Sequence, residues 1–228
     1  MNKEQLSNLI RNAEQGDAES QFSLGGLYCN GQGVPKDDTI ARQWFEKAAA
    51  QGNARAQFSL GKMYTHGMGV RWDDIMARQW YEKSADQGNA DAQHMLGVHY
   101  HSHPERPEDY ATARQWYEKA AAQGNVSANL FIGCLYAHEH GLGQDYTKAR
   151  EWYEKAAAQG DVDAAAFLGE LYKVGRGVQQ DFVKAWQWFQ KAAEQGNERA
   201  QVFLGELYAK GLGVPQDDVR AYMWWSSH

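Results

Sequence analysis

The chain of 228 residues carries 23 Lys and Arg against 29 Asp and Glu, which gives a net charge of −6 with histidine neutral. This balance offers no basic stripe that could neutralise phosphates, so we do not expect a nucleic acid as partner. Hydrophobic residues make up 43% of the chain, but polar residues interrupt every apolar run, so we expect no membrane insertion.

A Gln-Gly pair returns along the whole sequence at a constant spacing of 36 residues, as from Gly16 to Gly52. A fixed period of this length is typical of a solenoid, in which each repeat buries its apolar face only against its neighbours. We therefore predict an N-terminal capping helix within residues 1–16, followed by six consecutive repeats. Their predicted boundaries are 17–52, 53–88, 89–124, 125–160, 161–196 and 197–228, the last one truncated.

The first predicted helix covers residues 4–14, where apolar side chains recur at helical spacing and cap the first repeat. The residues around it carry charges early and lack the apolar core of a signal peptide. As written, the chain is expected to be cytoplasmic, or periplasmic or secreted if a leader has been removed.

Each repeat begins with a predicted helix, which in the second repeat covers residues 54–65. Apolar residues at i, i+4, i+7 and i+8 from Ala56 form one stripe along it. Gly61 interrupts the helix at a cost of about 1 kcal/mol against alanine, which indicates that a second helix crosses closely there. Asn53 is the predicted N-cap, because its side chain can accept from the free N–H groups of the first turn. Equivalent glycines are Gly25, Gly97, Gly133, Gly169 and Gly205, and equivalent caps are Asp17, Asn89, Asn125, Asp161 and Asn197.

A glycine-containing connector, residues 66–70 in the second repeat, leads to a second predicted helix. Asp73 is its expected N-cap, where a carboxylate gains from the cap hydrogen bond and from the helix dipole. Trp80 and Tyr81 fall on its apolar stripe among alanines, so we expect both rings in the core. The equivalent caps are Asp37, Asp109, Asp145, Asp181 and Asp217. The ring pairs recur as Trp44-Phe45, Trp116-Tyr117, Trp152-Tyr153, Trp188-Phe189 and Trp224-Trp225.

Two connectors and the last helix depart from this pattern. Residues 101–107 replace the glycine motif in the third repeat, and residues 137–143 shift it by two places in the fourth. The final helix ends soon after Trp225, which leaves its apolar face thinly covered and open to self-association. In all, we predict six helices of the first kind and seven of the second.

The complete motif resembles the Sel1-like repeat family, whose members are relatives of tetratricopeptide repeats. In the fifth repeat it is carried by Ala164, Leu168, Gly169, Tyr172, Gly175, Gly177, Val178, Asp181, Ala185, Trp188, Lys191, Ala192 and Gly196. The resemblance covers nearly the whole chain. It implies an all-α, right-handed α-solenoid of stacked antiparallel helix pairs that acts as an adaptor for other proteins or peptides, with no shared catalytic residues. One branch of the family has a bridged cysteine pair in each repeat, and this chain lacks those pairs.

The two cysteines, Cys29 and Cys134, lie three repeats apart. If like helices stack at roughly 8–10 Å, the two residues are separated by about 25–30 Å. A disulfide needs Cα atoms within about 7 Å, so we expect two free thiols, in keeping with a reducing compartment.

The first helices of a helical-pair solenoid line its concave surface, and their positions outside the packing stripe vary from repeat to repeat in size and charge. We predict that these positions bind a partner protein or peptide through apolar anchors flanked by charges. The alternative is that the aromatic rings among them turn inward and fill gaps, and the sequence leaves this open. The predicted groove residues are Glu19, Phe22, Arg55, Phe58, Lys62, Asp91, His94, Met95, Leu130, Phe131, Asp163, Phe167, Glu170, Lys173, Arg199, Phe203 and Glu206.

Histidines in the connectors suggest a second function, a metal-binding or metal-responsive module. The pairs His101/His103 and His138/His140 could complete a tetrahedral Zn²⁺ site or a Ni²⁺ site if stacking brings the connectors together. The alternative is a polar loop tip with solvated imidazoles. A thermal shift on adding Zn²⁺ or EDTA separates the two functions.

The repeat pattern explains the one match to a known enzyme motif. The string from Ser59 to Lys62 fits the S-x-x-K motif of serine β-lactamases, but the S-D-N and K-T-G motifs that accompany it do not occur. Its equivalents in the first repeat are Ser23 and Gly26, so the repeat itself explains the match. We therefore expect no enzyme activity, no catalytic residue and no cofactor.

Overall fold

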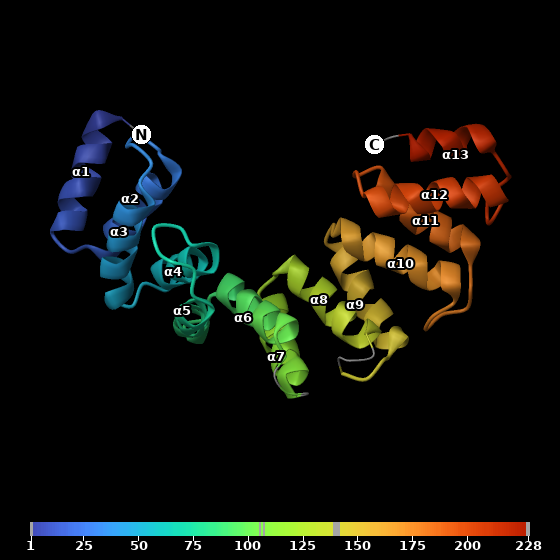
Figure 1. Cartoon of the computed structure of the whole chain (residues 1–228), viewed down its shortest axis with the longest axis horizontal. Helices are drawn as coiled ribbons and strands as arrows, with labels where there is room; N and C mark the ends of the chain where they lie inside the picture. Colours follow the sequence, from blue (N-terminus) through green and yellow to red (C-terminus); the bar gives the residue numbers. More distant parts are fainter. Residues whose placement is uncertain (1, 105, 107, 139–141, 227–228) are drawn as a thin grey trace. The chain divides into compact units, whose positions relative to one another are not determined.

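The computed structural model describes residues 2–104, 106, 108–138 and 142–226 and is all-α, with thirteen helices in these residues. The helices follow one another in the predicted alternation along the chain (Figure 1). They are α1 (Lys3–Glu14), α2 (Ala18–Asn30), α3 (Asp38–Ala50), α4 (Ala54–His66), α5 (Asp74–Asp86), α6 (Ala90–Ser102), α7 (Glu108–Ala122), α8 (Val126–Ala137), α9 (Tyr146–Ala158), α10 (Val162–Val174), α11 (Phe182–Ala193), α12 (Glu198–Lys210) and α13 (Asp218–Trp225). No helix in these ranges combines the length and apolar character needed to cross a bilayer.

The helices form two compact bodies, an N-terminal body of residues 1–99 and a C-terminal body of residues 100–228. Within each body, helices pack mainly against the helices before and after them in the chain, as from α1 to α5 and from α7 to α13. The first helices of the last two repeats, α10 and α12, also touch. Each body is thus a stack in which contacts are local in sequence, as the repeat period predicts.

The predicted N-caps of the first helices are confirmed. In each case the cap side chain accepts a hydrogen bond from the backbone N–H three residues later, as in Asn53 to Ala56 at 2.9 Å. The six caps are Asp17, Asn53, Asn89, Asn125, Asp161 and Asn197. The glycine after the second helix adopts positive φ, as Gly52 does at +86°, so the chain can reverse direction into the next cap.

The N-caps of the second helices are confirmed at five positions and wrong at one. Asp37, Asp73, Asp145, Asp181 and Asp217 each accept from the first turn of their helix. Asp109 instead lies inside α7, because this helix begins one residue earlier, at Glu108. Its buried carboxylate accepts from the backbone N–H of Arg106 at 2.8 Å. The altered third connector therefore changes the start of the helix as well as the loop.

The predicted close crossing is confirmed at five of the six helix glycines and stays a prediction at Gly97, and the group that crosses is an aromatic ring. A Cβ atom built on Gly61 would stand 2.5 Å from ring atoms of Tyr81, and one on Gly169 would stand 2.5 Å from those of Phe189. Real Cβ atoms do not approach other atoms so closely, so only glycine fits beside these rings. Gly25, Gly133 and Gly205 face Phe45, Tyr153 and Trp225 in the same way.

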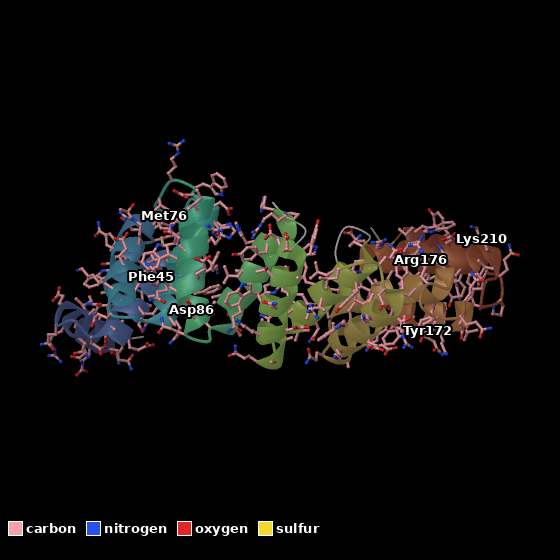
Figure 2. All side chains as sticks on the ribbon, turned by 90° about the horizontal axis from the view of Figure 1, so that it is seen from below. Phe45, Met76, Asp86, Tyr172, Arg176 and Lys210 are labelled. Atoms are coloured by element: carbon pink, nitrogen blue, oxygen red, sulfur yellow. The ribbon has the colours of Figure 1, made fainter. Side chains whose placement is uncertain are left out.

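In the first five repeats only the second ring of each predicted aromatic pair lies in the core, and in the last repeat neither does, because Trp224 is half-buried and Trp225 is 47% exposed. The second residue is buried, at Phe45, Tyr81, Tyr117, Tyr153 and Phe189 (Phe45 is labelled in Figure 2). The tryptophan before it is half-buried, and the lysine three residues later lies over its ring, with Nζ between 3.6 and 5.3 Å from the centroid in the first five repeats. The prediction that both rings fill the core is therefore wrong for the tryptophans, whose outer faces meet a cation instead.

Candidate functional site

The predicted groove residues lie on one face of the first helices, which we call the first-helix face. Leu130 is the exception, because it is buried in the core of the C-terminal body. Ala166, at the equivalent position of α10, is buried too, so this position points inward in that body. The exposed residues are Glu19, Arg55, Lys62, Asp91, Asp163 and Arg199, and the half-buried ones are Phe22, Phe58, His94, Met95, Phe131, Phe167, Glu170, Lys173, Phe203 and Glu206.

Each phenylalanine of this face packs one side of its ring on a buried ring of a second helix, so each fills space in the stack while it stays half-buried. Phe22 and Phe58 pack on Phe45 and Tyr81 of their own repeats, with ring centroids 5.7 and 5.8 Å apart. The other three rings pack on the preceding repeat: Phe131 on Tyr117, Phe167 on Tyr153 and Phe203 on Phe189, with centroids 5.5, 5.2 and 4.9 Å apart.

A shift of one position along the helix explains this change of partner. Phe58 stands two residues before the stripe residue Leu60, whereas Phe167 stands one residue before Leu168. One residue turns a side chain by about 100° around the helix axis, enough to move the ring from its own repeat to the preceding one.

In the N-terminal body, cations cover the phenylalanine rings. The Arg55 guanidinium carbon lies 4.2 Å from the Phe22 ring centroid, and Arg55 also forms an ion pair with Glu19 at 2.7 Å. Lys62 Nζ lies 5.8 Å from the Phe58 ring centroid. The charges predicted to flank apolar anchors are therefore in place, but Arg55 already has a partner within the face.

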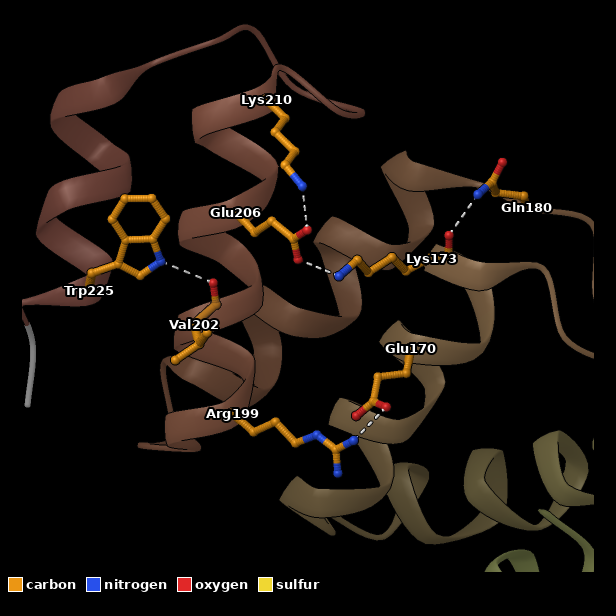
Figure 3. Close-up of polar contacts among 8 residues, drawn as sticks. All are labelled: Glu170, Lys173, Gln180, Arg199, Val202, Glu206, Lys210 and Trp225. Carbon is orange, nitrogen blue, oxygen red and sulfur yellow. Dashed lines mark hydrogen bonds and ion pairs between the residues drawn. The ribbon is translucent and has the colours of Figure 1, made fainter. Parts of the chain in front are cut away.

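In the C-terminal body, ion pairs join the first helices of the last two repeats (Figure 3). Arg199 of α12 donates to Glu170 of α10 at 2.7 Å. Glu206 of α12 accepts from Lys173 of α10 and, at 2.8 Å, from Lys210 of its own helix. Both ion pairs between the helices connect neighbouring repeats. They therefore hold α10 and α12 together in addition to fixing the positions of these surface side chains.

The two glutamates of these pairs differ in protonation behaviour. Hydrogen bonds from Lys173 and then Lys210 lower the pKa of Glu206, because they favour the ionised carboxylate. Burial raises the pKa of Glu170, and it outweighs the opposing charges of Arg199, Lys173 and Arg176. The Oε1 atom of Glu170 is buried and has no hydrogen-bond partner. Glu206 is thus well satisfied as an anion, whereas Glu170 is not.

We expect the Glu206 ion pairs to give a pH-dependent contribution to stability. A carboxyl whose pKa is lowered by folding stabilises the folded chain above the ordinary value of about 4.3, and this stabilisation is lost as the pH falls through the lowered value. The difference in unfolding free energy between wild type and Glu206→Gln, measured by urea titration, should therefore shrink as the pH is lowered. Glu198→Gln, an exposed change on the same helix, is the control. A difference that stays constant down to acid pH would contradict the assignment.

A pocket of about 570 Å³ opens beside α10 in the C-terminal body. Phe167, Glu170 and Arg199, all predicted groove residues, line it. The lining also includes Arg176 and Tyr146, at the start of α9, which were not predicted as site residues. They lie in or next to connectors, whose course is not set by the helix period, so periodicity alone could not place them.

The predicted metal ligands are only partly brought together. His101 lies in the last turn of α6, not in a connector, and its ring packs against those of Tyr110, Tyr117 and Phe131 at centroid distances of 6.2 to 6.3 Å. Burial, followed by the nearby charge of His138, lowers the pKa of His101. His103 and His138 are exposed, and His140 lies outside the described residues.

No group of three or more metal-ligating side chains in the described residues includes His101 or His138. The metal site proposed from the four histidines therefore stays a prediction. Both cysteines are free thiols, as expected.

Comparison with solved structures gives the same fold. The chain is 38% identical to c5321, described as a protective antigen present in uropathogenic Escherichia coli strains and displaying an SLR fold, with a TM-score of 0.90. That alignment covers 97% of this chain and 47% of c5321, so the chain spans about half the length of that relative. A Sel1 repeat protein from Oxalobacter formigenes is 40% identical over 92% of this chain and 86% of its own, with a TM-score of 0.82.

A more distant neighbour shares the fold alone. The Pseudomonas aeruginosa immunity protein Pa5087 is 20% identical over 92% of this chain and 80% of its own, with a TM-score of 0.55. The comparison with curated proteins gave no match.

The family model described as Sel1 repeat matches the sequence six times. The matches cover residues 18–53, 54–89, 90–125, 126–161, 162–197 and 198–227. Each begins one residue after the start of a predicted repeat. With the helix pairs, the close-approach glycines and these matches together, the chain belongs to the Sel1 repeat family.

Proposed function

We propose that the chain is an adaptor that binds a segment of a partner protein on its first-helix face and carries out no catalysis. Sel1 repeat proteins generally mediate protein–protein interactions and are generally not enzymes. The observation that carries the proposal is the contrast between surfaces. The glycines and buried rings return from repeat to repeat, whereas the first-helix face differs from one repeat to the next.

The chemistry of the face supports a polypeptide ligand. Half-buried phenylalanines offer apolar contacts on rings already fixed by stacking, so little side-chain freedom is lost on binding. The charges beside them, such as Arg55 and Arg199, can donate to a ligand and set its orientation. Exposed Val219 and Tyr222 on α13 support the further proposal of self-association through the last repeat.

Photo-cross-linking from two positions tests which surface binds. Val202 on the first helix α12 and Gln187 on the second helix α11 are both exposed, and each is replaced in turn by a photoreactive amino acid. We expect the probe at Val202 to cross-link a specific host protein in cells and the probe at Gln187 not to do so. The pair is matched because both positions lie in the C-terminal body.

Charge reversal is the quantitative arm of the same test. With the cross-linked protein purified, Arg55→Glu together with Lys62→Glu should weaken its affinity, while a change on the second helices, Lys47→Glu, should not. Cross-links from Gln187 alone, or equal affinity for the face variants and the wild type, would reject the first-helix face as the binding surface.

A further inference from the structure

The pocket beside α10 has an excess of positive charge. Arg176 and Arg199 line it against a single carboxylate, that of Glu170. Arg199 donates one hydrogen bond to Glu170, which leaves the other N–H groups of its guanidinium, five in all, for a ligand. The Arg199 side chain is 56% exposed. Among the described residues, Arg176 forms no ion pair, and its guanidinium carbon lies 5.3 Å from the Tyr146 ring centroid (Arg176 is labelled in Figure 2).

Much of the remaining wall is apolar, next to the polar side chains of Gln144 and His138. Tyr146 and Phe167 present ring surface, and Val174 is 54% exposed beside them. The volume of about 570 Å³ falls within the range of sites that enclose small ligands, about 300–1,000 Å³. The pocket therefore combines room for an apolar side chain with two guanidinium groups held against aromatic rings.

We propose that this pocket takes an aspartate or glutamate side chain of the partner segment, bound by Arg176 and Arg199, with a neighbouring apolar side chain against Tyr146 and Phe167. The inference rests on the proposed function. Guanidinium groups bind carboxylates through paired, charge-assisted hydrogen bonds, so both the charge and the planar geometry select this ligand.

Glu170 makes the binding of a carboxylate depend on pH. In its ionised form it holds one donor group of Arg199 and repels a second carboxylate. A ligand that binds Arg199 therefore favours protonation of Glu170, a group with a buried oxygen that has no partner. The other charges that face Glu170 are those of Lys173 and Arg176, and His138 also lines the pocket. Because binding is coupled to proton uptake, affinity should rise as the pH falls, until the ligand carboxylate itself is protonated near pH 4.

The experiment uses the full chain and three acetylated, amidated hexapeptides that differ only in one central residue, Glu, Gln or Lys, between leucine and phenylalanine. Binding is followed by NMR through the backbone amides of Leu171 and Arg176. We expect the Glu peptide to bind about tenfold more tightly than the Gln peptide at neutral pH. A Gln peptide with a free C-terminal carboxylate tests whether a chain end, rather than a side chain, is the source of the anion.

Four variants separate the roles of the pocket residues. Arg176→Gln and Arg199→Gln should each reduce the preference for Glu over Gln, while Arg220→Gln, whose ion pair with Asp217 lies outside the pocket, should leave it unchanged. Glu170→Gln should strengthen binding of the Glu peptide at neutral pH and flatten its pH dependence. A wild-type-like dispersion of the amide spectrum, with shifts confined to residues near the substitution, shows that each variant is folded.

Four results would overturn the inference. Tighter binding of the Lys peptide, with Glu170→Gln weakening it, would assign the pocket to a cationic donor. Equal binding of all amidated peptides would show that the pocket does not recognise a carboxylate, although the face would still bind a polypeptide. A preference for the free C-terminus would assign the anion to a chain end. If no peptide shifts the pocket amides, the inference also falls, and the cross-linking experiment still decides the proposed function independently.

Discussion

Replacing Phe189 with alanine should lower the unfolding free energy of the C-terminal body by about 3–5 kcal/mol, as for other fully buried aromatic residues. The side chain is 0% exposed, one side of its ring packs on Phe203, and ring atoms lie against Gly169. Alanine would leave a cavity that the facing glycine has no side chain to fill. Hydrogen exchange of α10 to α12, measured with increasing urea, would report the loss locally.

The adjacent residue provides the control for this prediction. Trp188 is half-buried, and Lys191 lies over its ring with Nζ 5.3 Å from the centroid. Trp188→Ala should therefore cost only about 1–2 kcal/mol, from partial burial and a weak cation–π contact. If Trp188→Ala proved as costly as Phe189→Ala, the assignment of the second ring alone to the core would be wrong.

Two neighbouring glycines of α2 should respond to alanine with opposite signs. A Cβ on Gly25 would meet the Phe45 ring at 2.7 Å and the Ala41 carbonyl oxygen at 3.2 Å. Phe45 is buried and packs on Phe22, so its ring cannot easily move away, and we expect Gly25→Ala to cost about 1–3 kcal/mol through overpacking. A Cβ on Gly26 would meet nothing within 4 Å, so Gly26→Ala should stabilise the helix by up to about 1 kcal/mol.

Chemical denaturation of the two single variants beside wild type measures both effects. They share a helix, a residue type and a substitution, so helix propensity cancels between them. Equal shifts in the same direction would show that the ring does not restrict Gly25.

The repeat pattern predicted the helix order, the caps and the close crossings because each depends on a short stretch of sequence. Asn53 caps its helix whatever lies around it, and Gly61 interrupts a helix where alanine would be favoured. The aromatic pairs were harder. Trp80 and Tyr81 both fall on the apolar stripe, and only the position of the neighbouring helices decides that Tyr81 is enclosed while Trp80 stays at its edge.

The site could be predicted only as a face. The groove positions follow from the helix period, so Arg55, Glu170 and Arg199 were found. Their ion pairs join residues 36 and 29 positions apart in the sequence and depend on side-chain conformations that no local pattern specifies. Asp109 and His101 were misplaced because the third repeat replaces the glycine connector, so the helix ends next to it could not be carried over from the other repeats.

The position of the phenylalanines also affects how each of the two bodies unfolds. Where Phe22 packs on Phe45, the ring pair is internal to one repeat, and a neighbour can melt without breaking it. Where Phe203 packs on Phe189, melting of the last repeat uncovers a ring that belongs to the repeat before it. Ring contacts between neighbouring repeats therefore couple the unfolding of repeats more strongly in the C-terminal body. A shift of the phenylalanine by one position decides whether a repeat unfolds alone or together with its neighbour.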